Sequence, residues 1–214
     1  PVVAGLSEAI TLQQAEAFFA VHADSGILLK AIAGGGGRGM RIVRSVDELA
    51  DAFARCQSEA LAAFANDGLY AEQLVASPRH IEVQIIGDGS GAVSHIWERE
   101  CSLQRRHQKL VEIAPSPTLD PAMRTAMCDA AVRLGKEINY AGLGTIEFLL
   151  DTNANEFFFI EANARLQVEH TVTEEVTGID LVRAQIEVAG GASLHDLGLQ
   201  QADVPDPRGY AIQL

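Results

Sequence analysis

The sequence predicts an α+β fold, in which helices are mixed with strands that pair largely as antiparallel hairpins. Three observations indicate this class. Apolar and polar residues alternate over 81–85, which is the period of a half-buried strand. Turn-forming residues, such as those at 88–91 and 152–155, separate neighbouring strand-like runs. Helical patterns start directly after residues that cap helix N-termini.

The helices are located by their capping residues. Thr11 with Gln14 has the spacing of a capping box, and a second capping box begins at Ser45. Asp120 is followed by Pro121, a combination of cap and first helical residue that opens a third helix. The four expected helices cover about residues 12–24, 46–64, 121–138 and 181–189.

The strands form two groups on either side of Ala-Ser-Pro at 76–78, which is expected to be a hinge. Residues 1–75 are expected to form a small α/β subdomain. Residues 76–214 are expected to form a larger subdomain on an antiparallel sheet, truncated at its C-terminus. The expected strands lie at 27–32, 40–44, 70–75, 81–85, 92–98, 144–151, 156–163 and 211–214.

The composition limits the classes of function. A net charge of −13 argues against a nucleic-acid partner, because a phosphate backbone requires a basic face. We expect no membrane span and no signal peptide. The three cysteines have no CxxC spacing, so we expect neither a disulfide framework nor a zinc site, and a cytoplasmic location with the mitochondrial matrix left open. The chain opens on Pro-Val-Val, and we expect it to be a segment of a longer protein.

The richest chemistry lies at 160–170, directly after an apolar run. Glu161 and Asn163 could offer Mg²⁺ the hard oxygen ligands that it prefers. Arg165 and Glu169 follow, where a small anion could be clamped and deprotonated. The alternative is that Arg165 and Glu169 form only a surface ion pair.

Glu147 is expected to join Glu161. It lies between Ile146 and Phe148 and therefore faces opposite to them. Positions 147 and 161 share parity, so a regular hairpin around residues 152–155 is expected to keep both carboxylates on one face. Two such carboxylates repel each other unless a cation lies between them. An exposed polar face without a metal is the alternative.

The glycine-rich run at 34–39 suits phosphate binding, because glycines let backbone N–H groups approach an anion closely. Lys30 lies in an otherwise apolar strand just before it and needs a partner, which a phosphate could be. The run fits neither the Walker A nor the Rossmann pattern, and a flexible hairpin loop is the alternative. Residues 105–109 form a dense basic cluster that we expect to bind a local anion. His80 and His107, taken alone, are more typical of structural histidines.

Three motifs together resemble a known family. They are Gly-Gly-Gly-Gly-Arg-Gly-Met at 34–40, the run 100–109 with its Gln-Arg-Arg-His-Gln-Lys sequence, and Glu-Ala-Asn-Ala-Arg-Leu-Gln-Val-Glu-His at 161–170. These are similar to the biotin carboxylase component of biotin-dependent carboxylases, and the resemblance runs nearly end to end. It implies an ATP-grasp fold in which residues 1–75 form a lid. It also implies an ATP-grasp ligase that carboxylates biotin with bicarbonate through carboxyphosphate.

The resemblance implies a role for each matching residue. The residues implied to bind ATP are Lys30, Gly36, Gly37, Met40, Glu72, Gln73, Leu74, Val75, His80, Gln104 and His107. Those implied to hold Mg²⁺ (or Mn²⁺), and through it the nucleotide, are Glu147, Glu161 and Asn163. Those implied to hold bicarbonate are Lys109, Arg165, Gln167, Val168 and Glu169. Lys109, Arg165 and Glu169 are the implied catalytic residues, with Glu169 as the base.

The chain departs from the family in a few places. Gln73 stands where a basic or polar residue is usual, and Thr171 where proline is usual. The family's N-terminal domain, which carries an ATP-contacting lysine, is absent, and its biotin-contacting arginine falls directly after Leu214. The isolated segment is therefore expected to be inactive.

Two alternative functions stay open. One is another ATP-grasp ligase, such as a carbamoyl-phosphate synthetase, and the other is a nucleotide-binding module without catalysis. The partners implied are bicarbonate, a biotinylated carrier domain and a carboxyltransferase domain or subunit. The acceptor stays open among acetyl-CoA, propionyl-CoA, longer acyl-CoA, pyruvate and urea.

Overall fold

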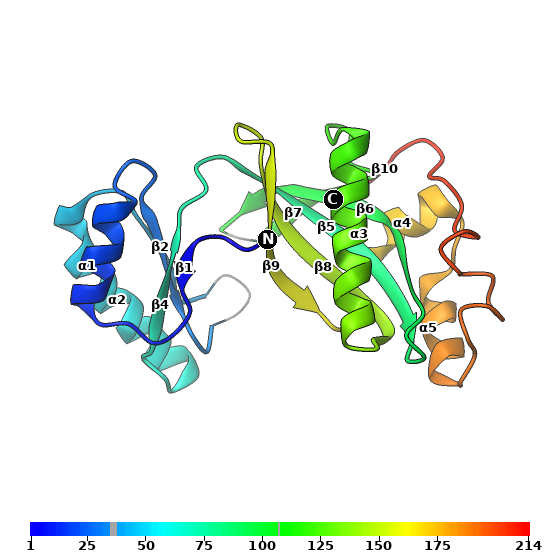
Figure 1. Cartoon of the computed structure of the whole chain (residues 1–214), viewed down its shortest axis with the longest axis horizontal. Coiled ribbons are helices and arrows are strands. Elements are labelled where there is room, and N and C mark those ends of the chain that lie inside the picture. Colours follow the sequence, from blue (N-terminus) through cyan, green and yellow to red (C-terminus); the bar gives the residue numbers. More distant parts are fainter. Residues whose placement is uncertain (35–37, 107) are drawn as a thin grey trace. The chain divides into compact units, whose positions relative to one another are not determined.

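The structure is a computed structural model that describes residues 1–34, 38–106 and 108–214 (Figure 1). The chain divides into two compact units. The N-terminal unit comprises Pro1–Ser77 and the described residues of 105–108, and the C-terminal unit comprises Pro78–Gln104 and Lys109–Leu214. Helices and antiparallel strands are mixed throughout, which confirms the predicted α+β class. Within the described residues, no helix combines the length and apolar character needed to cross a membrane.

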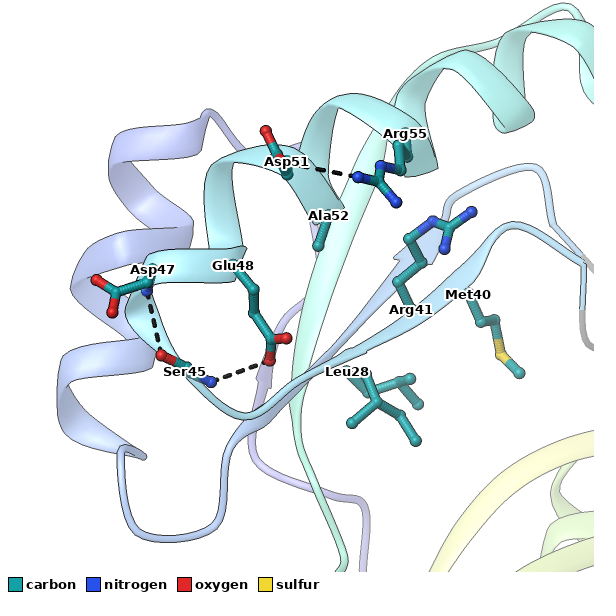
Figure 2. Close-up of a pocket in the computed structure, with 10 residues that line it drawn as sticks. Leu28, Met40, Arg41, Ser45, Asp47, Glu48, Asp51, Ala52 and Arg55 are labelled. Atoms are coloured by element: carbon teal, nitrogen blue, oxygen red, sulfur yellow. Dashed lines mark hydrogen bonds and ion pairs between the residues drawn. The ribbon is translucent and has the colours of Figure 1, made fainter.

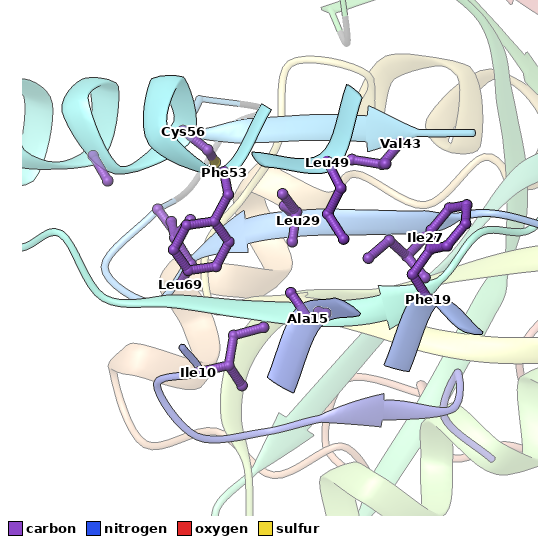
Figure 3. Close-up of a cluster of buried hydrophobic side chains, with 13 residues drawn as sticks. Ile10, Ala15, Phe19, Ile27, Leu29, Val43, Leu49, Phe53, Cys56 and Leu69 are labelled. Atoms are coloured by element: carbon purple, nitrogen blue, oxygen red, sulfur yellow. The ribbon is translucent and has the colours of Figure 1, made fainter. Parts of the chain in front are cut away.

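The N-terminal unit is a four-stranded sheet packed against two helices. Its strands, in the order β1-β4-β2-β3, are β1 (Gly5–Leu6), β4 (Leu69–Gln73), β2 (Ile27–Ala31) and β3 (Met40–Val43). The helices are α1 (Leu12–Val21) and α2 (Val46–Phe64). Figure 3 shows their shared core, where Phe19 of α1 and Leu49 of α2 lie over Ile27 and Leu29 of β2. Burial of these side chains against the sheet is the main force that stabilises the unit.

Both capping boxes predicted in this unit are confirmed. The side chain of Thr11 accepts a hydrogen bond from the backbone of Gln14, and Ser45 with Glu48 repeats the arrangement at the start of α2. Helix α1 ends at Val21, three residues earlier than predicted. Strand β4 ends at Gln73, so Leu74 and Val75 lie beyond the strand that was predicted to include them.

The C-terminal unit is built on a six-stranded sheet in the order β10-β7-β6-β5-β8-β9. Its strands are β5 (Pro78–Asp88), β6 (Val93–Arg105), β7 (Gln108–Ala114), β8 (Ala141–Asp151), β9 (Glu156–Asn163) and β10 (Ala211–Gln213). Its helices are α3 (Pro121–Glu137), α4 (His170–Thr177) and α5 (Leu181–Ala189). Figure 1 shows α3 lying across one face of the sheet.

The two faces of this sheet differ in chemistry. On the α3 face, Ile81, Val83 and Phe148 pack against Met127 in a dry core. On the opposite face, α5 contributes Leu181 to a second apolar cluster with Ile96, and α4 packs Val172 against Ala114. Since successive side chains in a strand point to opposite faces, Glu82 and Glu147 face away from the α3 core and lie buried nonetheless.

The β8–β9 hairpin corrects the reasoning that placed Glu147 and Glu161 together. Its pairing starts with Asp151 opposite Glu156, and that register would set Glu147 opposite residue 160. The register shifts after Phe148, which pairs with Phe159, so Glu147 pairs with Glu161 instead. Ile160 is the extra residue of a β-bulge. The two carboxylates share a face because of this bulge, and a regular hairpin would have separated them.

Several elements were not predicted. Strand β6 runs to Arg105 rather than residue 98, and β7 follows it directly. Helix α4 has only eight residues, of which five are Thr or Val, which are poor helix formers. Pro78, expected in the hinge, is instead the first residue of β5.

Candidate functional site

The ammonium group of Lys109 lies at the centre of a cluster of carboxylates in the C-terminal unit. Its Nζ is 3.0 Å from an oxygen of Glu147 and 2.6 Å from an oxygen of Glu169, and it also donates to Glu82. These partners come from β8, the residue before α4, and β5. All three carboxylates are buried. A permanent cation is therefore required here to compensate their charge.

The surroundings keep Lys109 and Glu147 ionised. Burial by itself lowers the pKa of Lys109, but the charges of Glu82 and Glu147 and the hydrogen bond to Glu169 raise it well above its ordinary value. Burial by itself raises the pKa of Glu147, but the hydrogen bond and charge of His80, together with the charge of Lys109, lower it to about 2. At neutral pH, Lys109 is thus a fixed cation and Glu147 a fixed anion.

The predicted metal ligands are brought together. The side-chain amide of Asn163 donates from Nδ2 to Glu147 at 2.9 Å and to Glu161 at 3.1 Å. Nε2 of His80 lies 2.6 Å from the other oxygen of Glu147. Two carboxylates that converge on one amide donor form an oxygen-rich set that also fits Mg²⁺, and a turned amide would add the oxygen of Asn163.

The loop between β9 and α4 carries the predicted anion-binding residues. The amide of Gln167 donates to Glu147 at 3.1 Å, while its Oε1 is buried without a hydrogen-bond partner among the described residues. Val168 is 77% exposed, and the guanidinium of Arg165 reaches the Asn163 oxygen at 3.4 Å. Arg165 and Glu169 form no ion pair with each other, since Glu169 pairs with Lys109. The surface ion pair considered as an alternative is therefore wrong.

His80 and Gln104 connect this cluster to the β6 strand. Nε2 of Gln104 lies 2.8 Å from Nδ1 of His80 and donates to the carbonyl of Cys101 at 2.8 Å. The imidazole ring thus links Gln104 to Glu147. The nucleotide-binding roles expected of His80 and Gln104 stay predictions.

In the N-terminal unit, the partner of Lys30 is a carboxylate. Its Nζ lies 2.8 Å from an oxygen of Glu72 and 5.5 Å from the centroid of the Tyr70 ring. Burial lowers the pKa of Lys30, but Glu72 raises it overall. Met40 pairs directly with Lys30 across the β2–β3 ladder. The predicted Gly36, Gly37 and His107 lie outside the described residues.

An open groove in this unit is lined mainly by residues without a predicted role. It has a volume of about 630 Å³ and lies beside β3 and the start of α2 (Figure 2). Two of its three acidic side chains already have partners, because Glu48 accepts from the backbone of Ser45 and Asp51 pairs with Arg55. Met40 alone among the predicted site residues lines it. The groove offers no arrangement suited to the predicted chemistry.

Three buried polar residues of the C-terminal unit were missed by the sequence analysis. Glu82 was placed in a half-buried strand without a role, and Arg99 and Thr173 were not considered. The only signal was the alternation of Glu82 and Gln84 with apolar residues, which indicates two different faces but not that α4 covers the polar one.

Comparison with known proteins identifies the family. The sequence model described as "Carbamoyl-phosphate synthase L chain, ATP binding domain" matches residues 1–197. The chain belongs to this family. It is 51% identical over 219 residues to the pyruvate carboxylase of Bacillus subtilis and 53% identical over 205 residues to the mitochondrial pyruvate carboxylase of Homo sapiens. These alignments cover 100% and 95% of this chain but only 19% and 17% of the relatives.

Solved structures agree with this assignment. A biotin carboxylase from Campylobacter jejuni superposes with a TM-score of 0.90 at 44% identity, and the biotin carboxylase domain of the Hydrogenobacter thermophilus 2-oxoglutarate carboxylase with 0.91 at 43%. Each match covers 99% of this chain and 46% of the other. The predicted ATP-grasp fold and the resemblance to biotin carboxylases are confirmed. The chain spans less than half the length of each of these four proteins.

The low pKa of Glu147 predicts a dependence of stability on pH. Because the folded-state pKa of about 2 lies below that of an unfolded glutamate, the carboxylate stabilises the fold above about pH 4.5 and loses this effect as pH falls toward 2. The difference corresponds to roughly 3 kcal/mol. We expect Glu147→Gln to flatten the change in unfolding free energy between pH 6 and pH 3, measured by urea denaturation. Glu156→Gln, at an exposed position, is the control, and an unchanged pH slope in Glu147→Gln would contradict the assignment.

Proposed function

We propose that this chain is the ATP-grasp part of a biotin carboxylase, which carboxylates biotin with bicarbonate at the expense of ATP. The observation that carries the proposal is the position of Lys109, whose ammonium contacts both Glu147 of the metal-ligand set and the Glu169 carboxylate. The Hydrogenobacter structure supports it, since that domain was crystallised with MgADP, ADP and bicarbonate.

In the proposed reaction, an oxygen of bicarbonate attacks the γ-phosphorus of ATP. Glu169 accepts the bicarbonate proton, and Lys109 with Arg165 stabilises the anion before and during attack. Gln167 and the backbone at Val168 hold its other oxygens. The attack displaces ADP and forms carboxyphosphate, which breaks down to CO₂ and phosphate. N1 of biotin gives its proton to the phosphate and forms its new bond to the carbon of CO₂. Mg²⁺ bound by Glu147, Glu161 and Asn163 would neutralise phosphate charge, and the protein's part is positioning.

The N-terminal unit is proposed to bind ATP and to act as the lid. Lys30 supports this, because it is half-buried and lies on the same face of the sheet as Met40 and Glu72. A phosphate would compete with Glu72 for its ammonium group. The other residues proposed to bind the nucleotide are Gly36, Gly37, Gln73, Leu74, Val75, His80, Gln104 and His107.

The rival ligase and the partners also belong to this proposal. A carbamoyl-phosphate synthetase would share ATP and bicarbonate but not biotin, and the relatives described above are carboxylases. A biotinylated carrier and a carboxyltransferase are the proposed partners, and the latter would choose the acceptor. The proposed location is the cytoplasm, or the mitochondrial matrix if the protein comes from a eukaryote like the human relative.

The proposal predicts ATP hydrolysis that depends on bicarbonate. With the full-length protein that carries this chain, we expect Mg-dependent phosphate release that needs bicarbonate and rises further when free biotin is added. Formate and acetate should not replace bicarbonate, since neither can form carboxyphosphate. A rate of ATP hydrolysis that changes with neither bicarbonate nor biotin would refute the proposal. A rate that depends on bicarbonate but is not raised by biotin would favour the rival ligase.

The metal assignment predicts a specific defect in Glu161→Gln. Loss of one carboxylate ligand should raise the Mg²⁺ concentration that gives half-maximal ATP hydrolysis by about tenfold or more, in the range typical of lost metal-site interactions. Titration of activity with MgCl₂ at saturating ATP measures the effect. Glu156→Gln, at the far end of the same strand and also exposed, should behave like the wild type. An unchanged Mg²⁺ dependence would remove Glu161 from the site.

The base assignment predicts that Glu169→Gln lowers kcat by about 10²–10⁴-fold, the usual contribution of a general base. Binding of MgADP, measured by calorimetry, should stay near the wild-type value because Glu169 is proposed to contact bicarbonate only. Glu175→Gln, exposed on α4, is the matched control. If Glu169→Gln retains more than about a tenth of the wild-type rate, Glu169 is not the base.

A further inference from the structure

Arg99 of β6 carries a guanidinium group with no solvent exposure. Its Nε donates to Glu82, and its Nη1 donates to Oε1 of Gln84 and to the hydroxyl of Thr173, each at 2.9 Å. Its Nη2 lies 3.3 Å from the hydroxyl of Thr145. One buried cation therefore joins β6 to β5, β8 and α4. Burial of a guanidinium is costly unless its donors are satisfied, so this position is tightly specified.

Every segment that Arg99 contacts also carries a partner of Lys109. One carboxylate oxygen of Glu82 pairs with Arg99, and the other oxygen pairs with Lys109. Thr145 precedes Glu147 by two residues on the same face of β8, and Thr173 follows Glu169 by four residues, one turn into α4. The guanidinium thus fixes the two strands and the helix start from which Glu82, Glu147 and Glu169 reach the ammonium group.

We propose that Arg99 is a positioning residue for the bicarbonate site, acting through Glu82 and Thr173 on Lys109 and Glu169. The inference rests on the proposed function. Arg99 binds one oxygen of Glu82, which leaves the other oxygen directed at Lys109. Arg99 also binds the hydroxyl of Thr173, which fixes the first turn of α4 and with it the preceding residue, Glu169. The planar fork of donors matters, because an ammonium group in its place has three donors on one nitrogen, fewer than the four acceptors that the guanidinium contacts.

A second arginine of the same unit provides a matched control. Arg124 of α3 donates from Nε to the fully buried Glu98 at 2.8 Å and from Nη2 to the carbonyl of Ser116 at 3.0 Å. This pair lies on the α3 face of the sheet and contacts neither Lys109 nor its three carboxylate partners. It resembles the Arg99 pair in chemistry and differs in its connection to the site.

The test compares Arg99→Lys with Arg124→Lys in the full-length protein. We expect Arg99→Lys to lower kcat of bicarbonate-dependent ATP hydrolysis by about tenfold to a hundredfold and to raise KM for bicarbonate, because small displacements of catalytic groups cost rates of this order. KM for MgATP should stay within about twofold. Arg124→Lys should leave kcat and both KM values near wild type. If Arg99 were only structural, Arg99→Lys would lower the concentration of active enzyme and would leave KM for bicarbonate and KM for MgATP both unchanged.

A milder variant covers the case in which Arg99→Lys does not fold. Thr173→Val removes only the link to α4 and keeps the ion pair, and we expect a several-fold loss of kcat with a near wild-type unfolding midpoint. If Arg99→Lys folds and has the same kinetics as Arg124→Lys, the inference alone is overturned. If Arg99→Lys does not fold, a wild-type kcat in Thr173→Val overturns it. A wild-type protein without bicarbonate-dependent hydrolysis overturns the proposed function and the inference with it.

Discussion

The C-terminal unit depends on the compensation of three buried carboxylates by the single ammonium group of Lys109. Left without a cation, the buried carboxylates of Glu82, Glu147 and Glu169 would repel one another without compensation. Arg99 shares the charge of Glu82 from the opposite side. Because these partners lie on β5, β6, β7, β8 and at the start of α4, the charge balance also holds those five segments in register.

The sheet makes this arrangement possible by separating two kinds of packing. Its α3 face is closed by apolar side chains such as Val83, Ile146 and Phe148. The neighbouring positions of the same strands, Glu82, Gln84 and Glu147, point the other way into a polar layer. The apolar face supplies most of the free energy of folding through burial, while the polar layer specifies which strands and side chains meet. A site built on such strands is held rigidly, as positioned chemistry requires.

The sequence was sufficient wherever structure is set locally. Both capping boxes and the Asp120–Pro121 helix start were correctly predicted, because the interacting groups lie within four residues of each other. Tertiary burial decided what was missed. Helix α4 forms despite its β-branched residues because it buries Val172 and Val176. Strand β6 continues through charged residues because Arg99 and Glu100 have partners inside the protein. The sequence motifs identified Glu147 and Glu169 beside Lys109, but neither Glu82 nor Arg99, whose neighbours in sequence reveal nothing of their partners.

The bulge at Ile160 shows how the core and the site constrain each other. Phe157 and Phe159 pack on the α3 face against Phe148, which fixes the register of the outer half of the hairpin. With a strict period of two, that register would send Glu161 and Asn163 toward the same apolar core. The extra residue reverses their direction, so that Asn163 pairs with Thr145 and reaches Glu147. A single inserted residue thus lets one strand serve an apolar core at one end and a polar layer at the other.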